Sequence, residues 1–193
     1  MRAMNLPNFL TLARILLIPV FLVFYMIPGE GTNLAASLLF ALAAFTDWLD
    51  GYLARRLDQT TKFGAFLDPV ADKLIVVSAL VLLIGYHHSL WLTIPGIVIV
   101  GREIVISALR EWMAEMNRRG IVAVTWFGRV KTAFQMVAIV VLLASPPEVD
   151  DIWVRLGYTL LYIAAAMTLV SMVMYLRAAW PTLMAGLSSD SRE

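Results

Sequence analysis

Six apolar segments, separated by short polar breaks, limit what this chain can fold into more than any other feature. They lie at residues 9–27, 33–50, 66–86, 91–112, 126–145 and 152–176. Each is about as long as an α-helix that crosses a bilayer, roughly 20 residues. Hydrophobic residues make up 61% of the 193 residues and charged residues only 15%, which excludes an ordinary soluble globule. The sequence therefore predicts an all-α membrane protein, a six-transmembrane-helix bundle within one domain at 1–186, followed by a flexible polar tail at 187–193.

Basic residues are distributed unevenly along this arrangement. One side of the predicted bundle collects nearly all of them, whereas the other side has only Arg155 beside the acidic Glu30, Glu148, Asp150 and Asp151. Because basic loops are retained in the cytoplasm, both termini are expected there. The first apolar segment has no small-residue cleavage site and is interpreted as a retained span.

Four aspartates interrupt the apolar pattern on either side of the second break. Asp47 and Asp50 are spaced i, i+3, and Asp68 and Asp72 are spaced i, i+4, so each pair can share one face of a helix. Unpaired charges beside apolar spans are costly, and four carboxylates close together take up protons unless a cation keeps them ionised. The sequence contains no cysteine and no suitably placed histidine, so oxygen ligands for two Mg²⁺ ions, or Mn²⁺, are favoured over a zinc site.

Two such ions can clamp a diphosphate and neutralise its leaving oxygen. Gly51 and Gly64 lie beside the aspartates, and without side chains they would let a bulky ligand approach the backbone. The alternative is that the carboxylates simply pair at helix ends with nearby basic side chains, namely Arg55, Arg56, Lys62 and Lys73.

The full spacing resembles the signature of the CDP-alcohol phosphatidyltransferases. It runs Asp47, two residues, Asp50-Gly51, two residues, Ala54-Arg55, eight residues, Gly64, three residues, Asp68, three residues, Asp72. The resemblance implies that Asp47, Asp50 and Asp68 mainly ligate metal and that Asp72 both ligates metal and is the catalytic base. It also implies a site for CDP-diacylglycerol formed by Gly51, Ala54, Arg55 and Gly64, together with Asn8, Thr11 and Arg14.

Near the start of the first apolar segment, Asn8, Thr11 and Arg14 are spaced i, i+3 and i+6, roughly along one side of the helix. Helix capping by Asn8 and snorkelling by Arg14 are the alternative roles.

Further cations lie inside the later spans. Arg110, Lys131 and Arg177 are candidates for binding the phosphate of an acceptor, because a buried cation needs an anionic partner. Simple anchoring of helix ends is the alternative. Arg102 and Glu103 fall near mid-bilayer, where Arg102 could pair with a carboxylate of the second or third helix, or both could line a cavity.

Residues 102–115 and 128–136 are similar to bacterial members of the family that use sn-glycerol 3-phosphate. The resemblance implies transfer of the phosphatidyl group of CDP-diacylglycerol to that alcohol, giving phosphatidylglycerol phosphate and CMP. It also implies a homodimer in the bacterial inner membrane, with its active site facing the cytoplasm and no nucleic-acid partner. Inositol phosphate, serine or phosphatidylglycerol remain as alternative acceptors. A transporter or cation channel would instead spread its carboxylates along a transmembrane path.

Overall fold

The computed structural model describes residues 6–29, 31–56, 61–116, 126–146 and 151–190. Within these residues the chain forms helices and no strand, which confirms the predicted all-α class. The helices are α1 (Leu6–Met26), α2 (Thr32–Arg56), α3 (Lys62–His87), α4 (Leu90–Glu115), α5 (Trp126–Ala144) and α6 (Ile152–Asp190).

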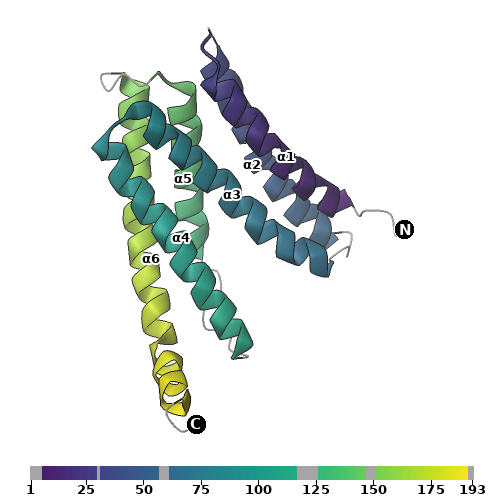
Figure 1. Cartoon of the computed structure of the whole chain (residues 1–193), viewed down its shortest axis with the longest axis vertical. Helices are drawn as coiled ribbons and strands as arrows, with labels where there is room; N and C mark the ends of the chain where they lie inside the picture. The colour runs from purple at the N-terminus through teal and green to yellow at the C-terminus, as the bar shows by residue number, and fades with distance from the viewer. Residues whose placement is uncertain (1–5, 30, 57–60, 117–125, 147–150, 191–193) are drawn as a thin grey trace.

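The helices form two groups joined by α3 (Figure 1). Helix α1 packs along α2 and α3, and α6 packs along α4 and α5. The two groups also meet where α2 packs against α5. In Figure 1 the α1–α2 pair leans away from α4 and α6, and α3 crosses between them. This arrangement brings the α2 and α3 segments that carry the aspartates close to the basic segments of α4 and α5.

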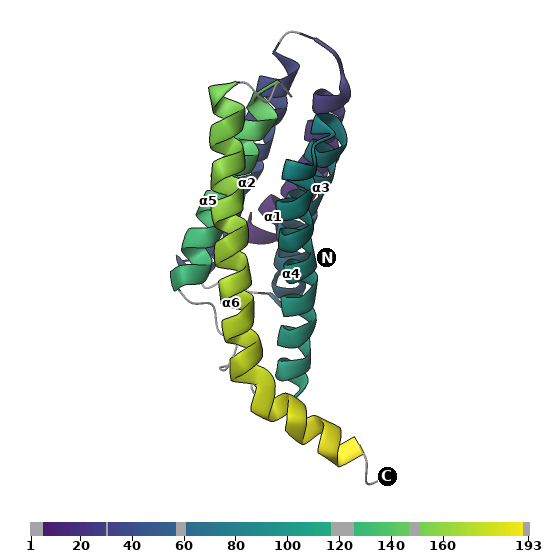
Figure 2. The same ribbon diagram turned by 90° about the vertical axis from the view of Figure 1, so that its left-hand side faces the viewer.

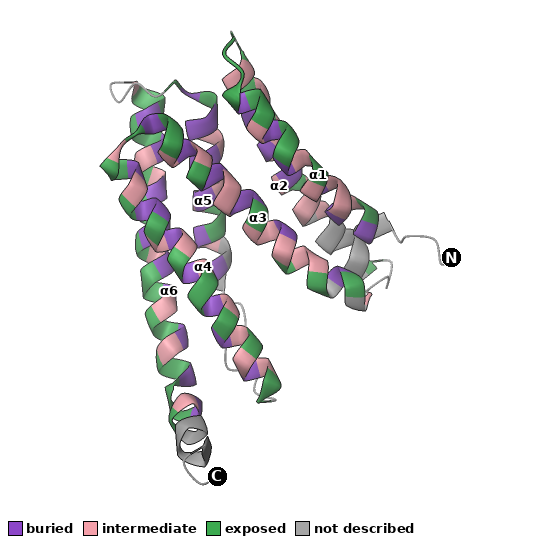
Figure 3. Ribbon diagram, viewed as in Figure 1, coloured by how far each residue is buried: buried purple, intermediate pink, exposed green. Residues whose placement is uncertain are grey.

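Two apolar clusters hold the bundle together. The larger cluster draws residues from all six described helices, including the edge-to-face pair Phe21 and Phe40, whose ring centroids are 5.8 Å apart. The smaller cluster joins α4 and α6 through Ile106, Met113 and Tyr175. Outward-facing positions also carry many large apolar side chains, so that exposed and buried residues alternate around each helix (Figure 3). A surface of this kind is suited to lipid and is consistent with a membrane protein.

Not every helix is uniformly apolar. In the described part of the chain, three helical stretches are long and apolar enough to cross a membrane, namely Asn8–Met26, Leu90–Glu115 and Ile152–Met184. Two shorter apolar stretches lie at Thr32–Asp47 and Val130–Ala144. The charged residues of the aspartate region interrupt α2 and α3, so the count of six spans stays a prediction.

Helix α6 is longer than the sequence predicted. It continues for 39 residues, past the expected end at 176, so the segment 187–190 is helical where a flexible tail was expected. Figure 2 shows α6 changing direction in its C-terminal part, which contains Pro181. Proline lacks an amide hydrogen and clashes with the preceding turn, so it bends a helix without necessarily ending it. Residues 191–193 lie outside the described part.

Candidate active site

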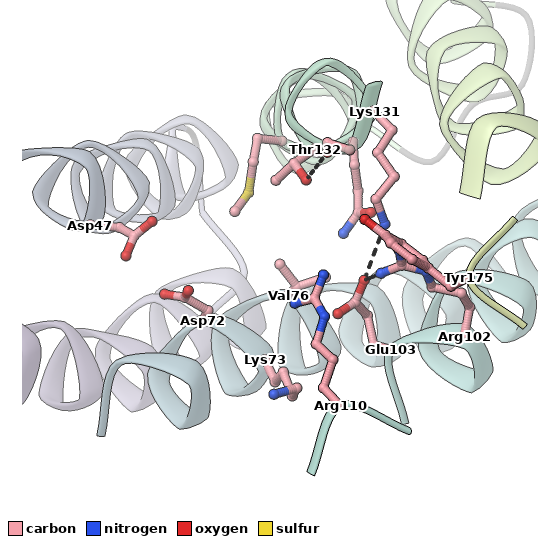
Figure 4. Close-up of a pocket in the computed structure, with 13 residues that line it drawn as sticks. Asp47, Asp72, Lys73, Val76, Arg102, Glu103, Arg110, Lys131, Thr132 and Tyr175 are labelled. Carbon is pink, nitrogen blue, oxygen red and sulfur yellow. Dashed lines mark hydrogen bonds and ion pairs between the residues drawn. The ribbon is translucent and has the colours of Figure 1, made fainter. Parts of the chain in front are cut away.

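Arg14 connects α1 to the aspartates of α2 and α3. Its side chain is fully buried, and its Nη1 donates to Asp47 Oδ1 at 2.6 Å and to Asp72 Oδ1 at 2.7 Å. One nitrogen contacts both oxygens, so the two carboxylates must lie close together, and Figure 4 shows them facing each other. Two of the four predicted aspartates therefore share one site, although they are 25 positions apart in sequence.

The other two polar residues of α1 also contact this region. Thr11 Oγ1 donates to Asp68 Oδ1 at 2.8 Å, and Asn8 Nδ2 donates to Thr61 Oγ1 at 3.0 Å. Thr61 in turn caps α3, because its Oγ1 accepts a hydrogen bond from the Gly64 amide at 2.9 Å. The predicted polar side of α1 is confirmed, and it faces the aspartate region rather than lipid.

Gly64 lies where α1 meets the start of α3. A Cβ at this position would lie 2.6 Å from Asn8 Oδ1 and 3.2 Å from Thr61 Oγ1. The Asn8 side chain occupies the space that glycine leaves, and the role of Gly64 in binding CDP-diacylglycerol stays a prediction. Glycine is needed here because α1 and the start of α3 approach so closely.

A polar cavity of about 260 Å³ extends from the paired aspartates into the space between α2, α3, α4, α5 and α6. Asp47 and Asp72 lie at one end, and the other end is basic (Figure 4). A second cavity of about 440 Å³ shares Asp72 with the first and reaches Asp68. Both cavities are bordered by Asp72, Lys73, Arg102, Glu103 and Arg110.

Glu103 lies within the basic end. Its Oε1 is 2.7 Å from Arg102 Nη1 and 3.4 Å from Lys131 Nζ, and both of these basic side chains are buried. Of the two alternatives left open for Arg102 and Glu103, the wall of a cavity is borne out, because both residues border the two cavities. Among the described residues Arg102 pairs with Glu103, its neighbour on α4, whereas Arg14 pairs with Asp47 of α2 and Asp72 of α3.

Two of the three predicted acceptor-binding cations lie at the cavity. Lys131 borders it from α5, and the side chain of Arg110 reaches into it from α4 (Figure 4). Arg177 is not among the residues that border the cavity: it is exposed in a shallow groove with Val173 and Trp180, and its role in acceptor binding stays a prediction. It follows the cavity residue Tyr175 by two positions, a spacing that puts the two side chains on different faces of a helix.

Sequence reasoning missed several residues of the cavity wall, among them Lys73, Gln135 and Tyr175. A signal for Tyr175 was present, because Thr168, Ser171 and Tyr175 form a buried polar stripe at helical spacing within an apolar span.

Four residues of the predicted site are described only by their backbone, which belongs to α2, namely Asp50, Gly51, Ala54 and Arg55. Their predicted roles in binding metal and nucleotide stay predictions.

The donor set suits a hard divalent cation. Asp47 and Asp72 present carboxylate oxygens toward each other, with Asp68 on the adjoining cavity, and magnesium and manganese prefer oxygen ligands. Among the described residues no three acidic or histidine side chains already converge on one point, and Arg14 supplies the neutralising charge between two of them. The described residues that would hold metal are Asp47, Asp68 and Asp72.

The cavity of this helical protein thus has an acidic end, which suits a cation, and a basic end, which suits an anion. Comparison with known proteins names the class: residues 4–182 match the model of the CDP-alcohol phosphatidyltransferase family, and the chain belongs to that family.

Several curated relatives carry one and the same name, CDP-diacylglycerol--glycerol-3-phosphate 3-phosphatidyltransferase. The relative from Pseudomonas fluorescens is 60% identical over 182 residues, which cover 93% of this chain and 92% of that protein. The relative from Sodalis glossinidius is 53% identical, covering 91% and 95% of the two chains, and that from Escherichia coli K12 is 52% identical, covering 91% and 94%.

Proposed function

We propose that this protein transfers the phosphatidyl group of CDP-diacylglycerol to sn-glycerol 3-phosphate, giving phosphatidylglycerol phosphate and CMP. The observation that carries the proposal is the cavity that joins the paired Asp47 and Asp72 to the cations Arg110 and Lys131. An acidic end suits a metal-bound diphosphate, and a basic end suits the phosphate of the acceptor. The names and the nearly full-length similarity of the relatives support the choice of both substrates.

The geometry supports a direct displacement at phosphorus. With the acceptor's phosphate bound by Arg110 and Lys131, the hydroxyl at the opposite end of the glycerol can point toward Asp72 along the cavity. The hydroxyl oxygen attacks the β-phosphorus, the bond from that phosphorus to the CMP oxygen breaks, and the hydroxyl proton passes to the Asp72 carboxylate. When bound, two Mg²⁺ or Mn²⁺ ions would neutralise the negative charge of the diphosphate and of the departing CMP. Asp72 is suited to the base role because it borders both cavities.

Arg14 and Thr11 then serve chiefly to orient carboxylates. Each donates a hydrogen bond to an aspartate on a neighbouring helix, which limits the rotamers that the aspartate can adopt. Binding of the cytidine and its phosphates is assigned to Gly51, Ala54 and Arg55, on the basis of family resemblance.

The proposed topology is six spans with both termini and the cavity on the cytoplasmic side of a bacterial inner membrane. It is supported by the alternation of helix direction and by the concentration of basic residues at one end of the bundle. The sequence has no cysteine, so single introduced cysteines can report on topology without background. Gly29→Cys and Ser89→Cys should react with an impermeant maleimide from outside intact spheroplasts, whereas Arg56→Cys and Met116→Cys should react only after lysis. The reverse pattern would overturn the orientation.

A homodimer is proposed from family resemblance. Crosslinking of the purified protein in lipid nanodiscs tests it, and a purely monomeric species would contradict it.

The activity is tested with purified protein, CDP-diacylglycerol labelled in the phosphatidyl group, and each candidate alcohol in turn. Glycerol 3-phosphate should give labelled phosphatidylglycerol phosphate with one CMP released per product. Inositol phosphate, serine and phosphatidylglycerol should give little product. No product from glycerol 3-phosphate, with product from another alcohol, would overturn the acceptor assignment.

A further inference from the structure

Tyr175 of α6 contacts two of the cations at the basic end of the cavity. The Cζ atom of Arg102 lies 5.9 Å from the centre of its ring, and that of Arg110 lies 5.6 Å from it. Only 6% of Tyr175 is exposed, and the residue packs in the smaller apolar cluster with Ile106 and Met113. The ring is therefore held in place by the core while it borders the cavity (Figure 4).

The two arginines differ in their other contacts. Arg102 is fixed by Glu103 on its own helix, and its Nη2 donates to Ser171 Oγ of α6 at 3.3 Å. Within the described chain, Arg110 makes no ion pair, and its buried Nε has no hydrogen-bond partner. The cation–π contact with the Tyr175 ring is therefore the attractive side-chain contact that the described residues show for the Arg110 guanidinium.

An aromatic face attracts a cation most strongly where water is largely excluded. Here one ring attracts two guanidinium groups, which would otherwise repel each other. Both guanidinium groups are thereby held beside the cavity, with a net positive charge that Glu103 only partly offsets.

We propose that Tyr175 is a positioning residue that orients Arg102 and Arg110 for binding the phosphate group of the acceptor alcohol. This inference rests on the proposed function and adds a determinant of acceptor recognition on α6. Tyr175 acts through the arginines, so its loss should weaken binding of the acceptor and leave the lipid substrate unaffected.

The test compares Tyr175→Leu, which removes the aromatic face, with Tyr175→Phe, which keeps it. Tyr162→Leu is the matched control, because Tyr162 lies on the same helix but borders an apolar groove with Trp91 and Tyr158. The KM for glycerol 3-phosphate should rise about tenfold in Tyr175→Leu, from two lost cation–π contacts, and stay within about twofold of wild type in the other two variants. The KM for CDP-diacylglycerol should change little in all three, whereas the apparent melting temperature of Tyr175→Leu should fall, because a buried ring is replaced by a smaller side chain.

Three results would overturn the inference. Tyr175→Leu could keep the wild-type KM for glycerol 3-phosphate, Tyr175→Phe could be as impaired as Tyr175→Leu, or both KM values could rise together as expected for a general packing defect.

A binding measurement separates this inference from the proposed reaction. Inorganic phosphate should raise the melting temperature of wild type and of Tyr175→Phe, and should do so less for Tyr175→Leu. If wild type fails to use glycerol 3-phosphate but shows this pattern, the proposed function is wrong and the anion site organised by Tyr175 stands. If phosphate affects all variants equally, the inference is wrong whatever the reaction.

Discussion

Arg14 Nη1 lies 2.7 Å from Asp72 Oδ1, joining the first and third helices at the acidic end of the cavity. The same nitrogen holds Asp47 of the second helix, so one buried guanidinium neutralises carboxylates from both halves of the aspartate motif. The first helix is therefore part of the site and not only a membrane anchor.

Replacing Arg14 should damage both stability and turnover. Arg14→Gln would leave two carboxylates facing each other without their counter-ion, and we expect a loss of about 2–4 kcal/mol in unfolding free energy. Turnover should fall at least tenfold, while Arg14→Lys, which keeps the charge, should be less impaired. Thermal unfolding in detergent and initial rates measure the two effects. Arg155→Gln is the control, because Arg155 is exposed near the start of α6 and does not border the cavity. Equal behaviour of Arg14→Gln and the control would contradict this role.

Removing the charge of an aspartate should stop the reaction without preventing insertion. Asp68→Asn and Asp72→Asn should each lower kcat by about 10²–10⁴-fold, the range expected when a general base or its electrostatic equivalent is lost. Asp151→Asn is a matched control, because Asp151 caps α6 through Trp153 N at 2.6 Å and asparagine caps equally well. Membrane fractionation confirms insertion. Retained turnover in either site variant would show that its carboxylate is dispensable.

Adding a single methyl group at Gly64 should be harmful. The Cβ of Gly64→Ala would lie 2.6 Å from Asn8 Oδ1, so the buried Asn8 side chain must move and weaken its hydrogen bonds with Thr61, at a cost of about 1–3 kcal/mol. Gly85→Ala, on the same helix, meets nothing within 4 Å and should be neutral or stabilising by up to about 1 kcal/mol. Melting temperatures of the two variants provide the comparison, and equal values would argue against the close α1–α3 contact.

The sequence predicted that aspartates of the second and third helices would come together, and Asp47 and Asp72 do so, because carboxylates at helical spacing share one face and that spacing is visible in the chain. It also identified the polar side of α1 from Asn8, Thr11 and Arg14. The hydrogen-bond partners of those side chains could not be predicted from the sequence, because the contacts join residues 33 to 58 positions apart.

The basic part was harder to predict. A cation within a span must find an anion or an aromatic ring, but sequence does not say which one. Arg102 pairs with its neighbour Glu103, Arg177 faces outward, and Tyr175 enters the site through the packing of α6 on α4. The length of α6 was underestimated because its expected bounds, 152–176, followed the apolar run that crosses a bilayer, whereas the helix continues beyond that run to Asp190.

Substitutions of Arg110 and of Arg177 should have different effects on the KM for the acceptor. Arg110→Gln removes a cation that borders the cavity, and the KM for glycerol 3-phosphate should rise roughly 10–100-fold, as for a lost charge-assisted hydrogen bond. Arg177→Gln should change it by less than about twofold, because exposed charges contribute little. Initial rates at varied acceptor concentration distinguish the variants. A larger effect from Arg177 would restore it to the site and displace Arg110.

Turnover should require Mg²⁺ or Mn²⁺. Excess chelator should abolish it, and either ion should restore it, because oxygen ligands favour these cations. A second measurement does not depend on turnover: Mg²⁺ should raise the melting temperature of wild type more than that of a double variant with Asp68→Asn and Asp72→Asn. Full activity in excess chelator would be incompatible with the metal assignment.

The most direct measurement is an experimental map of the protein with CDP-diacylglycerol, Mg²⁺ and glycerol 3-phosphate bound. The diphosphate should lie beside Asp47, Asp68 and Asp72, with the acceptor's phosphate against Arg110 and Lys131 and its hydroxyl directed toward the β-phosphorus. A diphosphate bound away from these aspartates, or an acceptor bound outside the cavity, would contradict the account.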